Sequence, residues 1–515
     1  MRLHSLYIRE AHSCGGILDD LEINFNRTQT ESNHSLSPLC VLGPNGSGKS
    51  QFLQLLSEIF QAAWHIHRPR QERNSENSEV LFELVYDIVL NDKLTTRIRL
   101  KRDSATKPKD SIEMEEKIEL DWVSISHEDE KYGERLPTSI IGYTSGDNET
   151  LSLPFFVSRA GYAKDVREAA LKPETSKSIV PENRLLHVDY ATHLEVLIAN
   201  LLLGGTGTDE ALLGHAGLNR LKSCRCILNL KPKSSVIKLT DELIKVIESL
   251  KSIATCWQLE KKAHTFTFDF FADVECKKGF AHNFETAELL YRSFHKLAML
   301  NDLAISKSAR DKFNRDVKSG QFAARLPVPQ DEDKVFRFEN VRLEKGKGEV
   351  DYVSLSDGEH QQAQIFGLFM MLNAPNTLFI LDEPESHFNP LWRVEFVKRL
   401  LDLPGSKPQQ EVILTSHAPF VASDISRENV LIFSKDDGKI NVRKPEIETY
   451  GATFDKILEH CFGVRPPISA MARDEIEELK KDGNIEELEK SMTRLGSSVE
   501  KAILADRLRQ LKSKE

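Results

Sequence analysis

The sequence predicts an α/β protein that carries a large, mainly helical insertion and a helical C-terminal segment. Three observations lead to this class. An apolar run at residues 39–42 is followed by a glycine-rich loop and then by apolar residues at helical spacing. Two further apolar runs, 378–381 and 412–414, end in polar residues, as the buried strands of a parallel sheet do. Long amphipathic patterns occupy much of the chain between the first run and the other two.

The composition is that of an ordinary globular protein. The chain has 515 residues, of which 40% are hydrophobic and 29% charged, so it is long enough for several domains or one elaborated domain. Its formal net charge of −10 argues against a basic coat for nucleic acid. The N-terminus has no apolar signal region, and no apolar stretch is as long as a membrane span. The seven irregularly spaced cysteines suit a reducing compartment, so we expect a cytoplasmic protein with no membrane partner.

Four parts are predicted along the chain. Residues 1–163 alternate strand-like pieces with one helix and form an N-terminal lobe that contains the glycine loop. Residues 164–330 form the mainly helical insertion. Residues 331–440 return to a series of strand, helix and strand and form a C-terminal lobe, and residues 441–515 form a charged helical region.

The insertion has its own pattern and charge. Helical periodicity runs over 239–258 and 284–303, and a strictly alternating stretch at 264–270 predicts a strand between them. Residues 204–325 contain 20 Lys and Arg against 14 Asp and Glu, an excess of six positive charges in an acidic chain. This excess is typical of a solvated helical face, and a nucleic-acid surface is the alternative.

The last stretch, 476–515, is charged and helical. Leu504, Leu508 and Leu511 fall on one face of a helix there. Such a face either packs against the rest of the chain or binds a partner helix, and the sequence leaves both readings open.

The glycine loop carries the first chemical prediction. Glycines let the backbone wrap closely around an anion, with N–H groups pointing inward at the start of a helix. The lysine would reach the β- and γ-phosphates of a nucleotide, and the serine hydroxyl that follows would be a Mg²⁺ ligand. The predicted nucleotide-binding residues are therefore Gly43, Pro44, Asn45, Gly46, Ser47, Gly48, Lys49 and Ser50.

An acidic pair ends the apolar run at 378–381. Asp382 can hold Mg²⁺ from the end of a buried strand, and Glu383 beside it is placed to polarise an attacking water. Two solvated acids that cap a strand are the structural alternative. The glycine loop in the same chain favours the functional reading.

Two weaker signals occupy consistent places in the order. A Ser-x-Gly turn opens an apolar helix, so Ser356 and Gly358 could present a hydroxyl and backbone N–H groups to an anion. A serine that only caps the helix would look the same. His417 follows the strand at 412–414 and could hydrogen-bond the γ-phosphate, although a single histidine at a strand end is more often structural.

Taken in order, these motifs resemble the ATP-binding-cassette (ABC) ATPases of the branch that contains chromosome-maintenance and OLD-like proteins. The fold implied is an ABC-type P-loop NTPase head with ATP and Mg²⁺ as cofactors. The resemblance implies a composite site in a head-to-tail homodimer. The loop, Asp382, Glu383 and His417 of one subunit would hold ATP, and Ser356 and Gly358 of the other subunit would close over it.

Within that branch, the sequence around 383–390 and 449–463 resembles the ATPase subunits of Septu antiphage systems (PtuA-like). The resemblance implies an oligomeric regulatory ATPase that acts on DNA through a separate HNH nuclease subunit (PtuB-like) and does not cut DNA on its own. Relatives also act as retron effectors, and a DNA-clamping repair ATPase of the chromosome-maintenance type is the remaining alternative. The stretch 142–146 falls where such ATPases place a glutamine loop, yet it contains no glutamine.

Overall fold

The computed structural model of this chain describes residues 1–25, 36–73, 80–90, 94–104, 112–145, 149–171, 180–188, 193–232, 236–318, 327–404, 409–436, 438–482 and 484–513. The chain forms two compact units, Met1–Tyr450 and Gly451–Glu515. The first unit contains every predicted site residue. The predicted boundaries at 163, 330 and 440 stay predictions.

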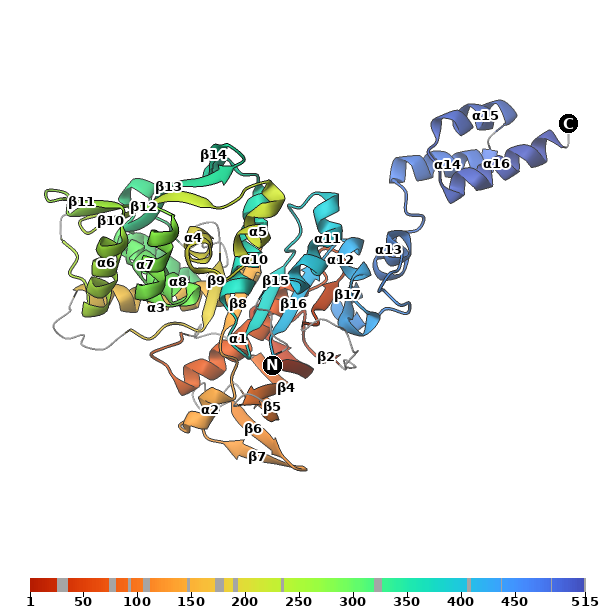
Figure 1. The fold of residues 1–515 in the computed structure, drawn as a ribbon. Helices are drawn as coiled ribbons and strands as arrows, with labels where there is room; N and C mark the ends of the chain where they lie inside the picture. The colour runs from red at the N-terminus through yellow and green to blue at the C-terminus, as the bar shows by residue number, and fades with distance from the viewer. Residues whose placement is uncertain are drawn as a thin grey trace. The chain divides into compact units, whose positions relative to one another are not determined.

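A seven-stranded sheet lies at the centre of the first unit (Figure 1). Six of its strands are parallel, and the edge strand β18 runs antiparallel to β17. In spatial order the strands are β18 (Lys439–Arg443), β17 (Val430–Asp436), β3 (Leu39–Leu42), β16 (Glu411–Ser416), β15 (Leu378–Asp382), β8 (Ile140–Thr144) and β9 (Leu185–Val188). Strands from both ends of the sequence therefore lie side by side, and β3 sits between β17 and β16.

The sheet is covered on both faces, which explains its continuous apolar runs. Every residue of β3, β15 and β16 is buried. The helix α1 (Lys49–His67) belongs to the apolar core that contains Ile380 and Ile413. On the other face, Phe369 of α10 (Asp357–Met371) stacks on Phe379 with a centroid distance of 4.0 Å. The remaining helices near this sheet are α11 (Pro390–Leu401) and α12 (Pro419–Ser423).

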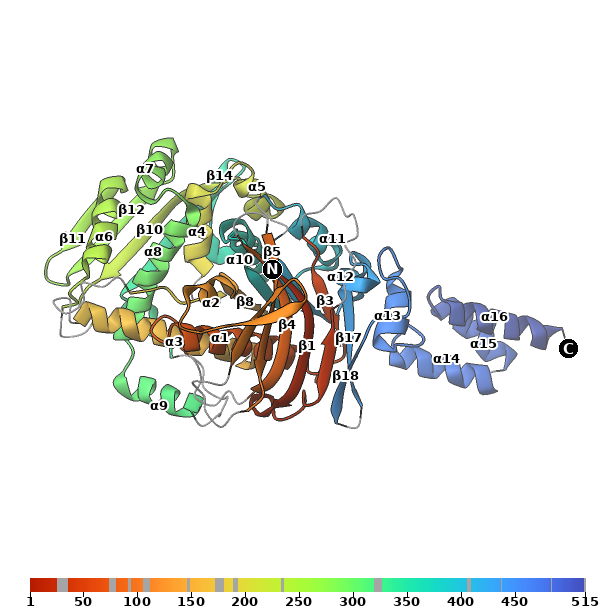
Figure 2. The same ribbon diagram turned by 90° about the horizontal axis from the view of Figure 1, so that it is seen from below.

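An antiparallel sheet packs on the far side of α1 (Figure 2). Phe60 of α1 meets Tyr86 of this sheet edge to face, with ring centroids 5.3 Å apart. The short helix α2 (Glu130–Glu134) follows its last strand. In spatial order the strands are β2 (Leu21–Asn24), β1 (Arg2–Ala11), β4 (Val80–Leu90), β5 (Leu94–Arg102), β6 (Glu113–Ile118) and β7 (Asp121–Ile125).

The insertion is mainly helical, as predicted, and it surrounds a third sheet. The alternating stretch at 264–270 forms the strand β12 (Thr265–Phe271), which confirms that prediction. The strands of this sheet are β11 (Cys256–Glu260), β12, β10 (Leu221–Asn229), β13 (Phe336–Lys345) and β14 (Gly348–Asp351). The helices of this region are α3 (Glu149–Leu171), α4 (His193–Leu203), α5 (Thr208–Leu213), α6 (Asp241–Ile253), α7 (Val274–Phe284), α8 (Ala287–Met299) and α9 (Lys307–Lys318).

One element of the insertion differs from the sequence prediction. Helical periodicity over 239–258 predicted one helix, but α6 ends at Ile253 and residues 256–260 form β11. The reason is non-local, because Cys256–Glu260 pairs antiparallel with β12 and thereby gains a ladder of backbone hydrogen bonds. Trp257 in this strand also has a high preference for extended structure.

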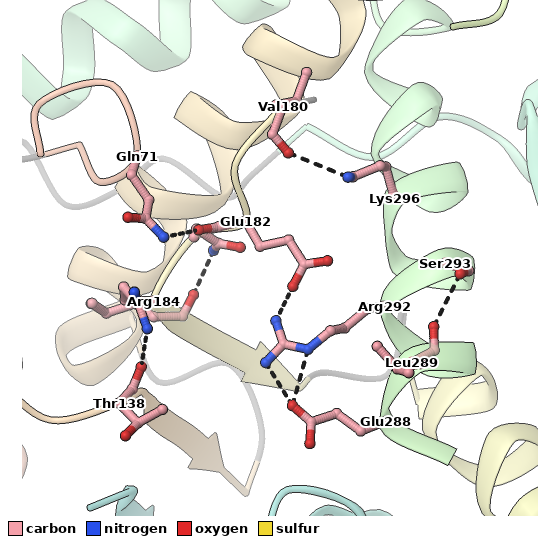
Figure 3. Close-up of polar contacts among 12 residues, drawn as sticks. Gln71, Thr138, Val180, Glu182, Arg184, Glu288, Leu289, Arg292, Ser293 and Lys296 are labelled. Atoms are coloured by element: carbon pink, nitrogen blue, oxygen red, sulfur yellow. Dashed lines mark hydrogen bonds and ion pairs between the residues drawn. The ribbon is translucent and has the colours of Figure 1, made fainter. Parts of the chain in front are cut away.

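A short segment before β9 ties the insertion to the head (Figure 3). Gln71, just after α1, donates a hydrogen bond of 2.9 Å to the carbonyl of Glu182. Arg184 donates one of 2.9 Å to the carbonyl of Thr138, just before β8. The Glu182 side chain forms an ion pair with Arg292 of α8. The segment 180–184 therefore contacts the turn that follows α1, the residue before β8 and the inserted helix α8.

The second unit contains the helices α13 (Phe454–Phe462), α14 (Ala470–Asp482), α15 (Ile485–Arg494) and α16 (Val499–Lys512). Ile476, Leu488 and Leu504 form its buried core, with Leu508 and Leu511 packed against them. The predicted apolar face of the last helix therefore packs within its own unit. In the part of the chain that the structure describes, no helix is both long enough and apolar enough to cross a bilayer.

Candidate nucleotide-binding site

The glycine loop connects β3 to α1, and its backbone can be formed only by glycines at two points. Gly43 has a φ of 153°, and a Cβ there would lie 2.3 Å from the carbonyl oxygen of Phe433 in β17. Gly48 has a φ of 86° and is the residue before α1. Gly46 also has a positive φ, of 77°. Because glycine adopts these positive φ angles without strain, the loop can bend tightly around an anion at the helix N-terminus.

The polar groups of the loop fit a phosphate chain. Lys49 is buried and donates hydrogen bonds of 2.9 Å and 3.1 Å to the carbonyls of Gly43 and Pro44. Burial lowers the pKa of Lys49 to about 8, although the charges of Glu383 and Asp382 oppose the shift. The Ser47 hydroxyl is buried and has no hydrogen-bond partner among the described residues. A phosphate oxygen could accept hydrogen bonds from both the Lys49 amine and the Ser47 hydroxyl.

The predicted metal ligands Ser50 and Asp382 lie in direct contact although they are far apart in the sequence. The Ser50 hydroxyl donates a hydrogen bond of 2.8 Å to Asp382 Oδ2, and the Thr415 hydroxyl donates one of 2.5 Å to Asp382 Oδ1. Burial raises the pKa of Asp382, and both hydrogen bonds oppose that rise. A hydroxyl and a carboxylate at this spacing fit Mg²⁺, which takes few protein ligands and fills its other positions with water and phosphate.

The predicted catalytic pair, Glu383 and His417, also meets at this edge of the sheet. His417 Nε2 lies 2.5 Å from Glu383 Oε1, and each side chain is about one third exposed. The hydrogen bond from His417 is the main reason why the pKa of Glu383 is lowered. Glu383 has a φ of 50°, a left-handed conformation that costs free energy in a residue with a β-carbon. Its backbone N–H donates a 3.0 Å hydrogen bond to the Thr415 hydroxyl, which supports this bend.

Ser356 and Gly358 lie at the N-terminus of α10, and no hydrogen bond or ion pair within the described chain joins them to the glycine loop. Ser356 caps α10 in a reciprocal arrangement with Glu359, which is the structural alternative weighed above. Ser356 is exposed, while Gly358 is buried, and a Cβ at Gly358 would lie 2.9 Å from the carbonyl oxygen of His387. The Ser356 hydroxyl also donates a hydrogen bond of 2.8 Å to Glu359 Oε2, so a second molecule would have to compete with this contact.

One further acid–hydroxyl contact belongs to this region, and the sequence analysis assigned it no role. Glu385 is fully buried and hydrogen-bonded to the Ser416 hydroxyl, and Ser416 directly precedes His417. Burial raises the pKa of Glu385 to about 7. The contact links the turn after β15 to the end of β16. The Glu-Pro-Glu sequence could have drawn attention to Glu385. Its partner Ser416 belongs to another strand, so the sequence alone could not reveal the contact.

The stretch predicted to replace the glutamine loop begins in β8. The backbone N–H of Ser145 donates a hydrogen bond of 3.2 Å to the carbonyl of Asp382, so this segment reaches the site. Gly146, at the end of the stretch, lies outside the described residues.

Comparisons with known proteins found one family model and a set of solved structures. The family model "AAA domain, putative AbiEii toxin, Type IV TA system" matches residues 229–423, which include α10, the acidic pair and His417. Among solved structures, the SMC head domain from Thermotoga maritima is 12% identical, with a TM-score of 0.33, and the match covers 87% of this chain and all of that one. An SMC head bound to the C-terminal winged-helix domain of ScpA is 10% identical, with a TM-score of 0.35 and coverages of 86% and 98%. No curated protein matched the sequence.

The contacts among the loop, the acidic pair and the two strand ends define the class of protein. They bring a glycine loop, a buried carboxylate and two hydroxyls together at one edge of a parallel sheet, which is the arrangement of a P-loop nucleotide-binding fold. The family model covers less than half of the chain. The predicted fold class is confirmed, whereas the individual site assignments remain predictions.

The buried Glu385 gives a test of the site's electrostatics. Its pKa in the folded chain, about 7, lies above the ordinary value of 4.5. The folded state therefore holds its proton more tightly than the unfolded state, and the stability of the wild type falls as the pH rises from about 4.5 to about 7. Glu385→Gln keeps the acceptor for Ser416 and cannot ionise. We expect its advantage over the wild type to grow across this range, by on the order of 2–3 kcal/mol, and then to level off.

Urea unfolding of both proteins at pH 5, 6, 7 and 8 measures this difference. Glu83→Gln, at an exposed carboxyl on β4, is the matched control. A difference that stays constant with pH, or an equal trend in the control, would contradict the buried-acid assignment.

Proposed function

We propose that this chain binds ATP with Mg²⁺ and hydrolyses it. The observation that carries the proposal is the hydrogen bond between Ser50 and Asp382, because it unites the glycine loop with the acidic strand end. The loop N–H groups and Lys49 would hold the phosphates, and Ser50 and Asp382 would hold Mg²⁺. The metal ion, when bound, offsets the negative charge of the phosphates.

Glu383 and His417 would act on the water and on the terminal phosphate. Glu383 is ionised and accessible, so its carboxylate can accept a hydrogen bond from a water molecule and orient it for attack. His417 occupies one oxygen of that carboxylate and keeps its orientation fixed. Thr415 holds both Asp382 and the backbone of Glu383, which keeps the metal-binding and water-binding groups in register.

Glu383→Gln tests the role of the carboxylate. We expect ATP hydrolysis to fall by about 100-fold or more, because the amide cannot act as a base, while ATP binding is retained. Steady-state hydrolysis and equilibrium binding of a fluorescent ATP analogue measure the two properties. Lys49→Ala should lose binding itself, and Glu83→Gln should change neither property. Hydrolysis at the wild-type rate in Glu383→Gln would remove this residue from the mechanism.

We further propose that two chains form a head-to-tail dimer with two composite sites. Ser356 and Gly358 at the start of α10 would meet the ATP held by the loop of the partner chain. The exposure of Ser356 and its position at a helix N-terminus support this arrangement, although Asp357 and Glu359 in the first turn of α10 oppose an anion there.

A mixing experiment separates this arrangement from a site made within one chain. Lys49→Ala destroys the loop, and Ser356→Arg blocks the α10 side, so each variant alone should be inactive. In an equal mixture, half of the dimers contain both variants and hold one intact site. We expect about a quarter of the wild-type hydrolysis rate. An inactive mixture of two variants that still form dimers would exclude the composite site.

We propose, at a finer level, that this ATPase regulates a separate HNH nuclease in a Septu-like antiphage system. The motifs at 383–390 and 449–463 support this proposal through their resemblance to Septu ATPase subunits. The matched family model, whose description names a toxin of a toxin–antitoxin system, is compatible with a regulated toxic activity. DNA would be reached through the complex and not by cleavage within this chain.

Affinity purification of the chain, expressed together with its native flanking DNA, tests the partner. We expect a small HNH protein to co-elute in a fixed ratio, and mass spectrometry identifies it. The Lys49→Ala and Glu383→Gln variants, purified in parallel, show whether the association depends on nucleotide. A reverse transcriptase with bound nucleic acid would replace the Septu assignment with a retron effector. Recovery of the chain alone with DNA would favour a clamp.

A further inference from the structure

A second cavity lies in the insertion, away from the glycine loop. It has a volume of about 450 Å³ and lies between α3, α9 and the short helix η3 (Leu300–Leu303), which follows α8. Figure 2 shows α3 and α9 in this region. A cavity of this size is in the range of small-molecule and cofactor sites. The negatively charged lining residues are Asp302 and Asp311. The positively charged ones are Arg159, Lys164, Arg167, Lys307, Arg310 and Lys334.

The lining of the cavity contains more positively charged than negatively charged side chains. Arg167 of α3 and Arg310 of α9 both approach Asp302, with nitrogen–oxygen distances of 2.5 Å and 3.8 Å. Arg310 also donates hydrogen bonds to the carbonyls of Asp302 and Ile305, which fix its guanidinium. All three charged side chains are less than one quarter exposed. Arg167 also lies 3.9 Å from Glu168, so Asp302 is the lining carboxylate that both guanidinium groups share. Their position is partly desolvated, and the attraction for an anion is stronger there than at the surface.

Two lysines add accessible charge at the rim. Lys164 of α3 and Lys307 of α9 line the cavity, and both are exposed. Neither forms a hydrogen bond or ion pair with any residue that the structure describes. Each could turn toward a ligand without breaking an existing contact.

The cavity also has apolar lining residues. They include Met299, Leu303, Val328 and the almost fully buried ring of Phe313. Guanidinium groups bind phosphate oxygens through paired hydrogen bonds, while an aromatic ring and a methionine offer a surface for a flat base. The lining therefore contains groups for both the phosphate and the base of a nucleoside phosphate.

An ion pair connects a helix of the cavity to the segment that follows α1. Asp165, between Lys164 and Arg167 on α3, forms a bidentate ion pair with Arg73 at 2.9 Å and 2.7 Å. Arg73 follows the C-terminal end of α1, whose N-terminus is formed by the glycine loop. A ligand that contacts Lys164 and Arg167 would therefore bind on both sides of Asp165. Through the ion pair with Arg73, it could shift the segment that follows α1.

We propose that this cavity binds a nucleoside phosphate, either free or at the end of a nucleic-acid strand, and that its occupancy changes the rate of ATP hydrolysis. The effect on hydrolysis rests on the proposed function, but binding to the cavity does not. The two parts can therefore be tested separately.

Binding is measured in the Lys49→Ala background, which removes nucleotide binding at the glycine loop. The probe is a 5′-phosphorylated single-stranded DNA decamer with a 3′ fluorophore, followed by fluorescence anisotropy, with dAMP as competitor. We expect Lys164→Glu combined with Lys307→Glu to weaken binding by about tenfold or more, because charge-assisted contacts are lost. Lys312→Glu is the matched control, because Lys312 is exposed on the same helix as Lys307 and does not line the cavity.

Each outcome decides the proposal. Binding that the double variant weakens and the control does not supports the cavity. Competition by dAMP then identifies a free nucleotide as a sufficient ligand, and its failure identifies a strand end. No binding of either probe, or an equal loss in Lys312→Glu, overturns the proposal, because diffuse surface charge would then explain the result.

The same double variant, with an intact Lys49, tests the coupling. We expect its basal ATP hydrolysis to match the wild type and its response to the decamer or to dAMP to be lost. A wild-type response in the double variant would overturn the coupling even if binding to the cavity is established. If the chain hydrolyses no ATP at all, the proposed function fails while the binding result still stands.

Discussion

The parallel pairing of β3, β16 and β15 is the constraint on which the rest of the site depends. Leu42, Ser416 and Asp382 stand at or next to the carboxyl ends of these strands, and the register aligns Leu42 with Ser416 and Asp382 with Thr415. The glycine loop, the acidic pair and His417 therefore leave the sheet at the same edge. In an open parallel sheet this edge is where ligands bind, because the loops that follow the strands meet there.

Burial of polar groups at this edge is stabilised by a small set of cross-strand contacts. Asp382 accepts hydrogen bonds from Ser50 and Thr415, and Glu385 is bonded to Ser416. A buried carboxyl without such partners would be strongly destabilising. The contacts thus have two effects at once. They make the burial tolerable, and they hold the reactive side chains in fixed positions around the space for phosphate.

The insertion is attached to the head at the far end of α1. Glu182 and Arg184 connect this end and the central sheet to α8, and Asp165 connects it to α3. Since α1 begins at the glycine loop, changes there and changes in the insertion act on opposite ends of one rigid helix. These contacts are a physical route by which the proposed coupling between the insertion and the site could act.

The sequence by itself determined the class of the fold, and it was enough to predict which residues form the site. The glycine spacing before Lys49, and the apolar runs that end at Asp382 and His417, are local patterns with few alternative explanations. The sequence could not decide the contacts between strands, such as those of Thr415 and Glu385, because they depend on register. It likewise predicted a helix where β11 forms, because pairing with β12 overrode local periodicity. The cavity between α3 and α9 was also decided only by the tertiary structure, since it gathers charges from segments that are far apart in the chain.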